Sequence, residues 1–164
     1  MRLDAFLTAA LIATTPLPAW SSDTHPQKEH TEMTPESAEV QQVRKAIDDL
    51  IQTATSYDVE VLDRIYHDRL HVVMIDSDHN LNTADKATFK DLFAAKRDAG
   101  DPPMNTWAKY HSIDVSEDTA HVLLSRKNDL SGVDMDLTLS IDLIFEDDRW
   151  QVTREVIFLR PDGT

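Results

Sequence analysis

The sequence has no cysteine among its 164 residues. This absence excludes disulfide bonds, zinc sites with thiolate ligands and cysteine nucleophiles. Glycine is scarce too, with only three residues. The chain contains no phosphate-binding loop, no HExxH or G-x-S-x-G motif and no dinucleotide-binding fingerprint. We therefore expect no cofactor and no metal.

Basic residues are few, with 16 lysines and arginines against 30 aspartates and glutamates, which gives a net charge of −14. Such a negative field repels the phosphates of nucleic acids and the surface of anionic lipids. We therefore expect no nucleic-acid partner, and no membrane partner once the segment described next has been removed.

The N-terminal apolar run, residues 5–13, is too short to span a bilayer. Arg2 precedes it, two prolines interrupt the chain after it, and Ala19-Trp20-Ser21 offers small residues at positions −3 and −1 of a cleavage site. This pattern predicts a secretory signal peptide over residues 1–21 and a periplasmic or secreted protein. Residues 22–33 are polar without periodicity, which is typical of a disordered linker.

The folded domain is expected over residues 34–160, with a short tail at 161–164. Thr34-Pro35-Glu36 is typical of a helix start, and apolar residues then recur every three or four positions from Val40 to Ala54. A short second helix is expected after Asp58, and a third between Thr83 or Asp85 and Gly100.

The second half of the domain has the two-residue periodicity of β-strands. A strand is expected at 71–75 with a brief return strand, and long strands at 104–115, 119–130, 133–146 and 149–159. The short turns between the long strands predict antiparallel neighbours. Three helices followed by a curved, mainly antiparallel sheet define an α+β fold.

The order of these elements resembles the nuclear transport factor 2-like superfamily over about residues 36–160. The resemblance is closest to the branch that carries a lumazine-binding label, and it rests on short structural motifs: the Tyr57-Asp58 turn, the helix with Phe89, Leu92 and Phe93, the hairpin around Asp114 and Asp118, and the closing Asp148-Arg149-Trp150-Gln151-Val152. It implies a cone-shaped domain in which the helices fill the mouth of a bent sheet. Because the superfamily includes isomerases, dehydratases, cyclases and binding modules, it implies no single activity.

Ligand-binding candidates are the polar and aromatic residues expected to face the cup between the sheet and the helices. Alternation predicts that His111 faces the same side as Trp107, and Arg154 the same side as Trp150. A buried cation needs a partner, and a bound anion is one. The candidate set is Tyr66, Trp107, His111 and Arg154; in the alternative, Arg154 pairs with a helix carboxylate such as Asp63 or lies at the solvent-exposed rim.

Acidic residues are expected outside the cup. Along the fifth strand the apolar side chains share one face, while Asp134, Asp136 and Asp142 share the other. No Asp or Glu is predicted on the inward faces of the last two strands. The register of the fourth strand stays open, because Arg126 lies either opposite Asp136 on the outer face or, after a shift of one residue, inward beside Lys109.

The resulting prediction is a non-catalytic domain that binds a small anionic or aromatic ligand in the cup. One alternative is an isomerase, dehydratase or cyclase with His111 as base and Tyr57, Tyr66 or Tyr110 as hydrogen-bond donor. Another is a structural homodimer that packs through the outer face of the sheet, although the aspartates there argue against a dry interface.

Overall fold

The structure is a computed structural model that describes residues 36–128 and 135–161. The predicted signal peptide, the predicted linker and Thr34 lie outside the described residues. So do Asp134 and the last three residues of the predicted tail.

In the part of the chain that the structure describes, three helices begin and end at recognisable caps. They are α1 (Ala38–Thr55), α2 (Val59–Ile65) and α3 (Lys86–Ala99). Asp58 and Asp85 accept hydrogen bonds from backbone amides of the first turns of α2 and α3, and Gly100 ends α3 with a φ of 74°. The cap of α1 is Ser37 and not the predicted Thr34, because the Ser37 side chain accepts the amide hydrogen of Val40.

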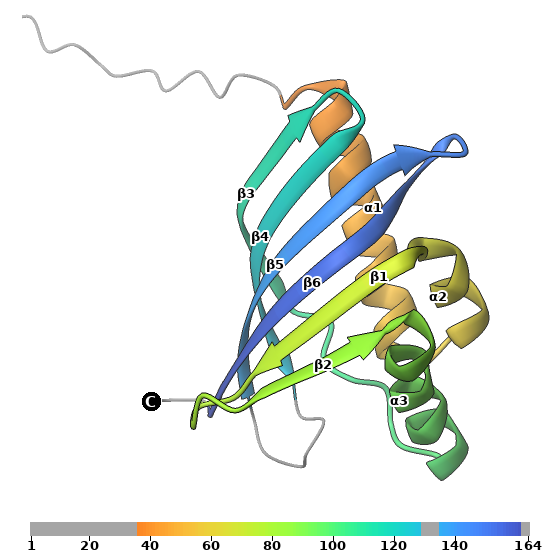
Figure 1. Cartoon of the computed structure of the whole chain (residues 1–164), viewed down its shortest axis with the longest axis vertical. Helices are drawn as coiled ribbons and strands as arrows, with labels where there is room; N and C mark the ends of the chain where they lie inside the picture. Colours follow the sequence, from red (N-terminus) through yellow and green to blue (C-terminus); the bar gives the residue numbers. More distant parts are fainter. Residues whose placement is uncertain (1–35, 129–134, 162–164) are drawn as a thin grey trace, which may run out of the picture. The chain divides into compact units, whose positions relative to one another are not determined.

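Within the described residues, six strands form one mixed sheet in the order β2-β1-β6-β5-β4-β3 (Figure 1). β1 and β6 run parallel and every other neighbouring pair is antiparallel, so the predicted α+β class with a mainly antiparallel sheet is confirmed. β1 begins at Tyr66, earlier than predicted. The strands are β1 (Tyr66–Ile75), β2 (Leu81–Asp85), β3 (Ala108–Ser116), β4 (Thr119–Asn128), β5 (Met135–Glu146) and β6 (Arg149–Pro161).

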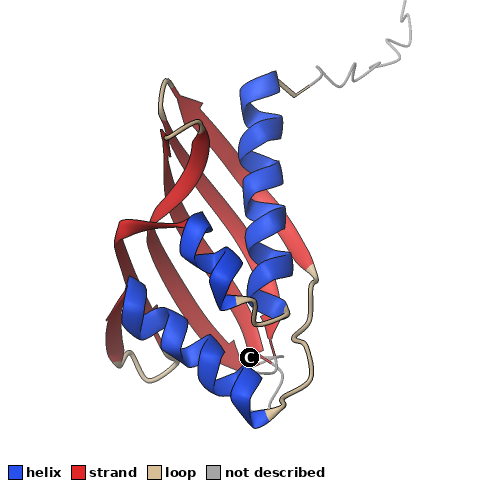
Figure 2. Cartoon of the chain, turned by 90° about the vertical axis from the view of Figure 1, so that its right-hand side faces the viewer, coloured by secondary structure: helices blue, strands red, loops and turns tan. Residues whose placement is uncertain are grey.

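All three helices lie on one face of the sheet (Figure 2). The apolar stripe of α1 packs there against the strands, and its Val43 and Ile47 are fully buried. The segment between α3 and β3 is fixed beside the end of α1. The amide of Met104 donates to the carbonyl oxygen of Thr55 at 3.0 Å, and the hydroxyl of Tyr57 donates to the carbonyl oxygen of Pro102 at 2.9 Å.

β-bulges change which residues of β3 and β6 face the helices. In β6, Val152 pairs with Leu143 of β5 and Arg154 pairs with its neighbour Asp142, so Thr153 is an extra residue on β6. An extra residue reverses the alternation of side chains beyond it. Val152 and Glu155 are therefore both buried, although their positions differ by three residues.

The bulge in β3 falls at His111. Tyr110 pairs with Leu124 of β4 while Ser112 pairs with Leu123, so His111 has no cross-strand partner in the ladder between these two described strands. The side chain of His111 is exposed.

Substitution of Ile47 tests this packing directly, because the side chain of Ile47 is fully buried between α1 and the sheet. We expect Ile47→Ala to lower the free energy of unfolding by about 2–5 kcal/mol through lost burial and the cavity left behind. Urea denaturation measures this change. Gln42→Ala, on the exposed side of α1, is the control and is expected to change stability by less than about 0.5 kcal/mol; equal effects of the two substitutions would contradict the packing.

Candidate functional site

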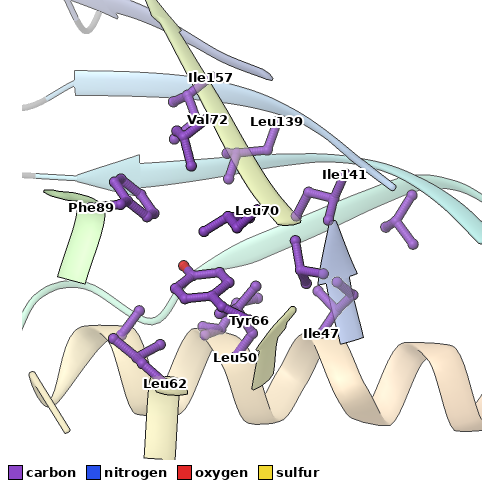
Figure 3. Packing of buried hydrophobic residues seen from close by; sticks show 14 of the residues in the cluster. Ile47, Leu50, Leu62, Tyr66, Leu70, Val72, Phe89, Leu139, Ile141 and Ile157 are labelled. Carbon is purple, nitrogen blue, oxygen red and sulfur yellow. The ribbon is translucent and has the colours of Figure 1, made fainter. Parts of the chain in front are cut away.

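A cavity of about 130 Å³ lies between the helices and the inner face of the sheet. Its walls are almost entirely apolar, with three polar side chains among them: Tyr66, Arg126 and Glu155. Figure 3 shows the ring of Tyr66 among the buried side chains, with its oxygen pointing away from α1. The apolar lining residues are Ile47, Leu50, Ile51, Ala54, Met74, Phe89, Leu92, Phe93, Met104, Leu124, Leu137, Leu139, Ile141, Ile157 and Leu159.

Tyr66 is the first residue of β1 and is 2% exposed. Its ring packs against Phe89 of α3 with 5.7 Å between the ring centroids, and Phe89 packs against Phe93 at 5.2 Å. These contacts hold the phenol in place. Burial and the neighbouring Glu155 carboxylate raise the pKa of Tyr66 well above its usual value, so the hydroxyl stays protonated and donates a hydrogen bond to Glu155.

Glu155 lies on β6 immediately beyond the bulge and is 3% exposed. Burial raises the pKa of this carboxyl group to about 7, although the hydrogen bond from Tyr66 and the charge of Arg126 act in the opposite direction. One carboxyl oxygen, Oε1, is buried without a hydrogen-bond partner among the described residues.

Arg126 reaches the cavity from β4, where it pairs with Leu137 of β5 and with Ala108 of β3. The inward alternative for Arg126 is therefore correct, but its neighbour on β3 is Ala108 and not Lys109. One terminal nitrogen of the guanidinium donates to the carbonyl oxygen of Asn105 at 2.6 Å. The Nε atom is buried and finds no hydrogen-bond partner in the described part of the chain. Burial lowers the pKa of Arg126, and the charge of Glu155 counteracts this.

The arrangement combines an apolar enclosure with a polar group of one acid, one phenol and one guanidinium. A carboxyl group with a pKa near 7 accepts and releases protons at neutral pH, and a neighbouring phenol or guanidinium stabilises negative charge that develops on a bound molecule. The same groups also hold a molecule by hydrogen bonds alone. Among the described residues, no cluster of three or more histidine or acidic side chains is arranged to hold a metal ion.

Comparison with known proteins identifies the fold. No protein-family model matches the chain, and no curated protein matches it. Solved structures do match. An NTF2-like protein of unknown function from Silicibacter pomeroyi is 17% identical, with a TM-score of 0.61 over 74% of this chain and 96% of that chain. A similar protein from Shewanella baltica is 14% identical, with a TM-score of 0.60 over 76% of this chain and 95% of that one.

A ketosteroid isomerase-like protein from Erwinia carotovora atroseptica matches as well, at 14% identity and a TM-score of 0.54 over 76% of this chain and 98% of that chain. At these identities a likeness shows the fold alone. The chain has the nuclear transport factor 2-like fold.

Of the four predicted ligand-binding residues, only Tyr66 lines the cavity of this nuclear transport factor 2-like domain. Trp107 precedes β3, is 45% exposed and is not part of the lining. His111 lies on the exposed side of β3, where its Nε2 is 2.8 Å from the hydroxyl of Ser125. Arg154 lies on the outer face of the sheet, where its Nε donates to Asp142 at 2.6 Å.

The predicted inward orientation of His111 and Arg154 is therefore wrong. For Arg154 the reason is the bulge in β6. In β3 the side chain of Tyr110 faces α1, so regular alternation already places His111 on the opposite side. The statement that the last two strands carry no inward acid is also wrong, because Glu155 is one. Asp142 and Asp136 do point outward as predicted, and the partner of Arg154 is Asp142 in place of the expected Asp63.

A network of charged side chains surrounds Asp142 on the outer face of the sheet. Asp142 accepts from Arg154 at 2.6 Å and lies 2.7 Å from Nδ1 of His121. Partial burial acts to raise the pKa of Asp142, but the hydrogen bonds and the charges of Arg154 and His121 together lower it. The network joins β4, β5 and β6 across the face opposite the cavity.

The two other tyrosines considered as donors are both engaged away from the cavity. Tyr57 donates to the carbonyl oxygen of Pro102, and Tyr110 donates to Oδ1 of Asp48 at 2.7 Å. Within the described residues, Tyr66 is thus the one tyrosine that lines the site.

Glu155 gives the stability of the domain a specific pH dependence. Its pKa is about 7 when folded against an ordinary value of 4.5, so between these values the folded protein retains a proton that the unfolded chain has released. The contribution of Glu155 to the free energy of unfolding therefore falls as pH rises through this window, by on the order of 3 kcal/mol in total.

We expect Glu155→Gln to remove this decline, so the variant gains stability relative to the wild type between about pH 5 and about pH 8. Urea denaturation of both proteins at the two pH values measures the change. Because the other carboxylates contribute equally to the pH dependence of both proteins, their contribution drops out of the comparison. Glu117→Gln, at an exposed position, is the control. A difference between wild type and Glu155→Gln that is the same at both pH values would contradict the burial of Glu155.

Proposed function

We propose that the protein is a non-catalytic binding module that holds a small, ring-sized organic ligand in the cavity. The observation that supports this most strongly is an apolar cavity whose polar groups gather around Glu155, Arg126 and Tyr66. The volume of about 130 Å³ is close to that of an engineered apolar cavity of roughly 150 Å³ that binds benzene. A single aromatic or cyclic ring is therefore the size that fits.

Energetics also favour a bound ligand. A buried polar atom without a hydrogen bond costs about 1–3 kcal/mol, more when the group is charged. The described structure leaves Oε1 of Glu155 and Nε of Arg126 in this condition within one site. A ligand that bonds to either atom recovers part of that cost, in addition to the burial of its own apolar surface.

A second candidate function is proton transfer, as in an isomerase, dehydratase or cyclase. It is favoured by Glu155, a buried carboxyl group with a pKa of about 7 that accepts a hydrogen bond from Tyr66. In this version Glu155 is the base, and Tyr66 or Arg126 stabilises the developing oxyanion. His111, proposed as the base from the sequence, is replaced because it is exposed on β3.

Three further proposals rest on the sequence. The first is export to the periplasm or the medium, which the pattern of residues 1–21 supports. In the described part of the chain, no helix has the length and apolar character needed to cross a membrane. The Tyr57-Asp58 turn and the closing strand from Asp148 support membership of the lumazine-binding branch. A homodimer through the outer sheet face would have to accommodate the ion pair of Arg154 with Asp142.

Filling the cavity tests the binding function. Leu139 is 7% exposed and lines the cavity, so Leu139→Phe adds a ring to the space that the ligand would occupy. We expect benzene and indole to perturb the NMR spectrum of the wild type at cavity residues, and the affinity for either compound to fall at least about tenfold in the variant. Gln42→Phe on exposed α1 is the matched control. If neither compound binds the wild type, the binding proposal fails.

The catalytic candidate is tested with a ring-sized substrate, 3-cyclohexen-1-one, whose conversion to the conjugated ketone is followed by ultraviolet absorbance. If the domain is a proton-transfer enzyme, the wild type converts it and Glu155→Gln lowers kcat by about 10²–10⁴-fold. Conversion by the wild type that is unchanged in Glu155→Gln would exclude Glu155 as the base. The absence of conversion by the wild type leaves the binding function as the sole proposal for this cavity.

A further inference from the structure

Two side chains that line the cavity each carry a buried polar atom without a hydrogen-bond partner, and the two atoms have opposite hydrogen-bonding character. Oε1 of Glu155 is an acceptor and Nε of Arg126 is a donor. Neither has a hydrogen-bond partner among the described residues, and both side chains line the same cavity.

The unpaired atoms of Arg126 and Glu155 do not hydrogen-bond to each other. Arg126 directs one terminal nitrogen to the carbonyl oxygen of Asn105, at 2.6 Å, while the hydrogen bond that Glu155 accepts comes from Tyr66. The two charges still influence one another, since the charge of Arg126 lowers the pKa of Glu155 against the effect of burial. Because both side chains line the same cavity, one small molecule bound there is flanked by both.

We propose that the ligand is a neutral cyclic amide of about one ring, whose N–H donates to Glu155 and whose carbonyl oxygen accepts from Arg126. This inference rests on the proposed binding function and adds the chemical class of the ligand. A carbonyl and an N–H on one ring supply one acceptor and one donor, which is the complement of the two unpaired atoms. The remaining ring atoms contact the apolar wall.

The charges of Glu155 and Arg126 favour a neutral ligand over an anionic one. With Glu155 ionised, its charge and that of Arg126 cancel, so a neutral ligand adds no uncompensated charge to an apolar site. A ring carboxylate would add a second negative charge beside Glu155, and its binding would require uptake of a proton. The groups that face Glu155 are Tyr66 from β1 and Arg126 from β4; the side chains that α1, α3 and β5 contribute to the cavity are apolar.

The two classes therefore differ in pH dependence. The ionised carboxylate is a stronger acceptor than the protonated carboxyl group, so the affinity for a cyclic amide rises as pH increases through the titration of Glu155 and is then constant. A carboxylate ligand needs the protonated form, so its affinity falls over the same range.

The test measures binding of 2-pyridone, benzoate and benzene to the full chain by NMR titration at about pH 5.5 and about pH 8. We expect 2-pyridone to bind at least about tenfold more tightly than benzene at the higher pH. Glu155→Leu removes the acceptor at similar volume and is expected to lose this advantage while benzene binding persists. Arg126→Met is expected to have the same effect, and Arg154→Gln, on the outer face, to have none.

The outcomes separate this inference from the proposed function. Benzene binding without any preference for 2-pyridone overturns the amide inference and leaves the binding function intact. No binding by any of the three compounds overturns both. Benzoate binding that exceeds that of 2-pyridone and weakens as pH rises overturns the amide class in favour of an anion.

Glu155→Gln is a second variant that keeps the test valid if Glu155→Leu misfolds, because glutamine keeps the shape of the side chain and an acceptor oxygen. We expect it to retain more of the 2-pyridone affinity than Glu155→Leu does. Equal losses in both variants, or full affinity in both, would contradict a specific hydrogen bond to Oε1.

Discussion

The site of this domain depends on one extra residue in the last strand. Thr153 lies between the positions where β6 pairs with Leu143 and with Asp142 of β5, and the alternation of side chains reverses there. With regular alternation from Val152, Arg154 would face the helices and Glu155 would face solvent. The bulge exchanges them. It places a carboxyl group in the cavity beside Tyr66 and Arg126, and it leaves Arg154 to pair with Asp142 on the outer face.

Burying Glu155 and Arg126 reduces stability, and the rest of the fold must compensate. Side chains such as Ile47, Leu124 and Ile141 are buried around the cavity, and the hydrogen bond from Tyr66 satisfies part of the Glu155 carboxyl group. The unpaired Oε1 of Glu155 and Nε of Arg126 are departures from the rule that buried polar atoms in the described structure find partners. Departures of this kind concentrate at functional sites, where a ligand completes the hydrogen bonding.

The fold was predictable because its signals are local and repeated. The stripe of α1, the caps at Asp58 and Asp85, the αL residue Gly100 and the strict alternation of β5 each constrain the chain without reference to distant residues. The predicted nuclear transport factor 2-like fold agrees with the solved structures that match the chain.

The site was less predictable, for a physical reason. A bulge shifts the alternation of side chains in a strand by one residue. In β6 the residues after the bulge do not indicate which of them face the helices. Residues 156–159 are all apolar, so they suit either face. The register of β4 is set by its pairing with β3 and β5, which placed Arg126 inward. Tyr66, the first residue of β1, was chosen correctly as a residue of the cavity. Its role in ligand binding stays a prediction.

The most direct test of the account is the titration of the Glu155 side chain itself, followed by the ¹³C chemical shift of its carboxyl carbon and assigned with Glu155→Gln. A buried carboxyl group beyond the bulge predicts a midpoint at about 7. A midpoint near 4.5, the ordinary value, would mean that Glu155 is in contact with water, and it would contradict both the bulge and the polar site built on it.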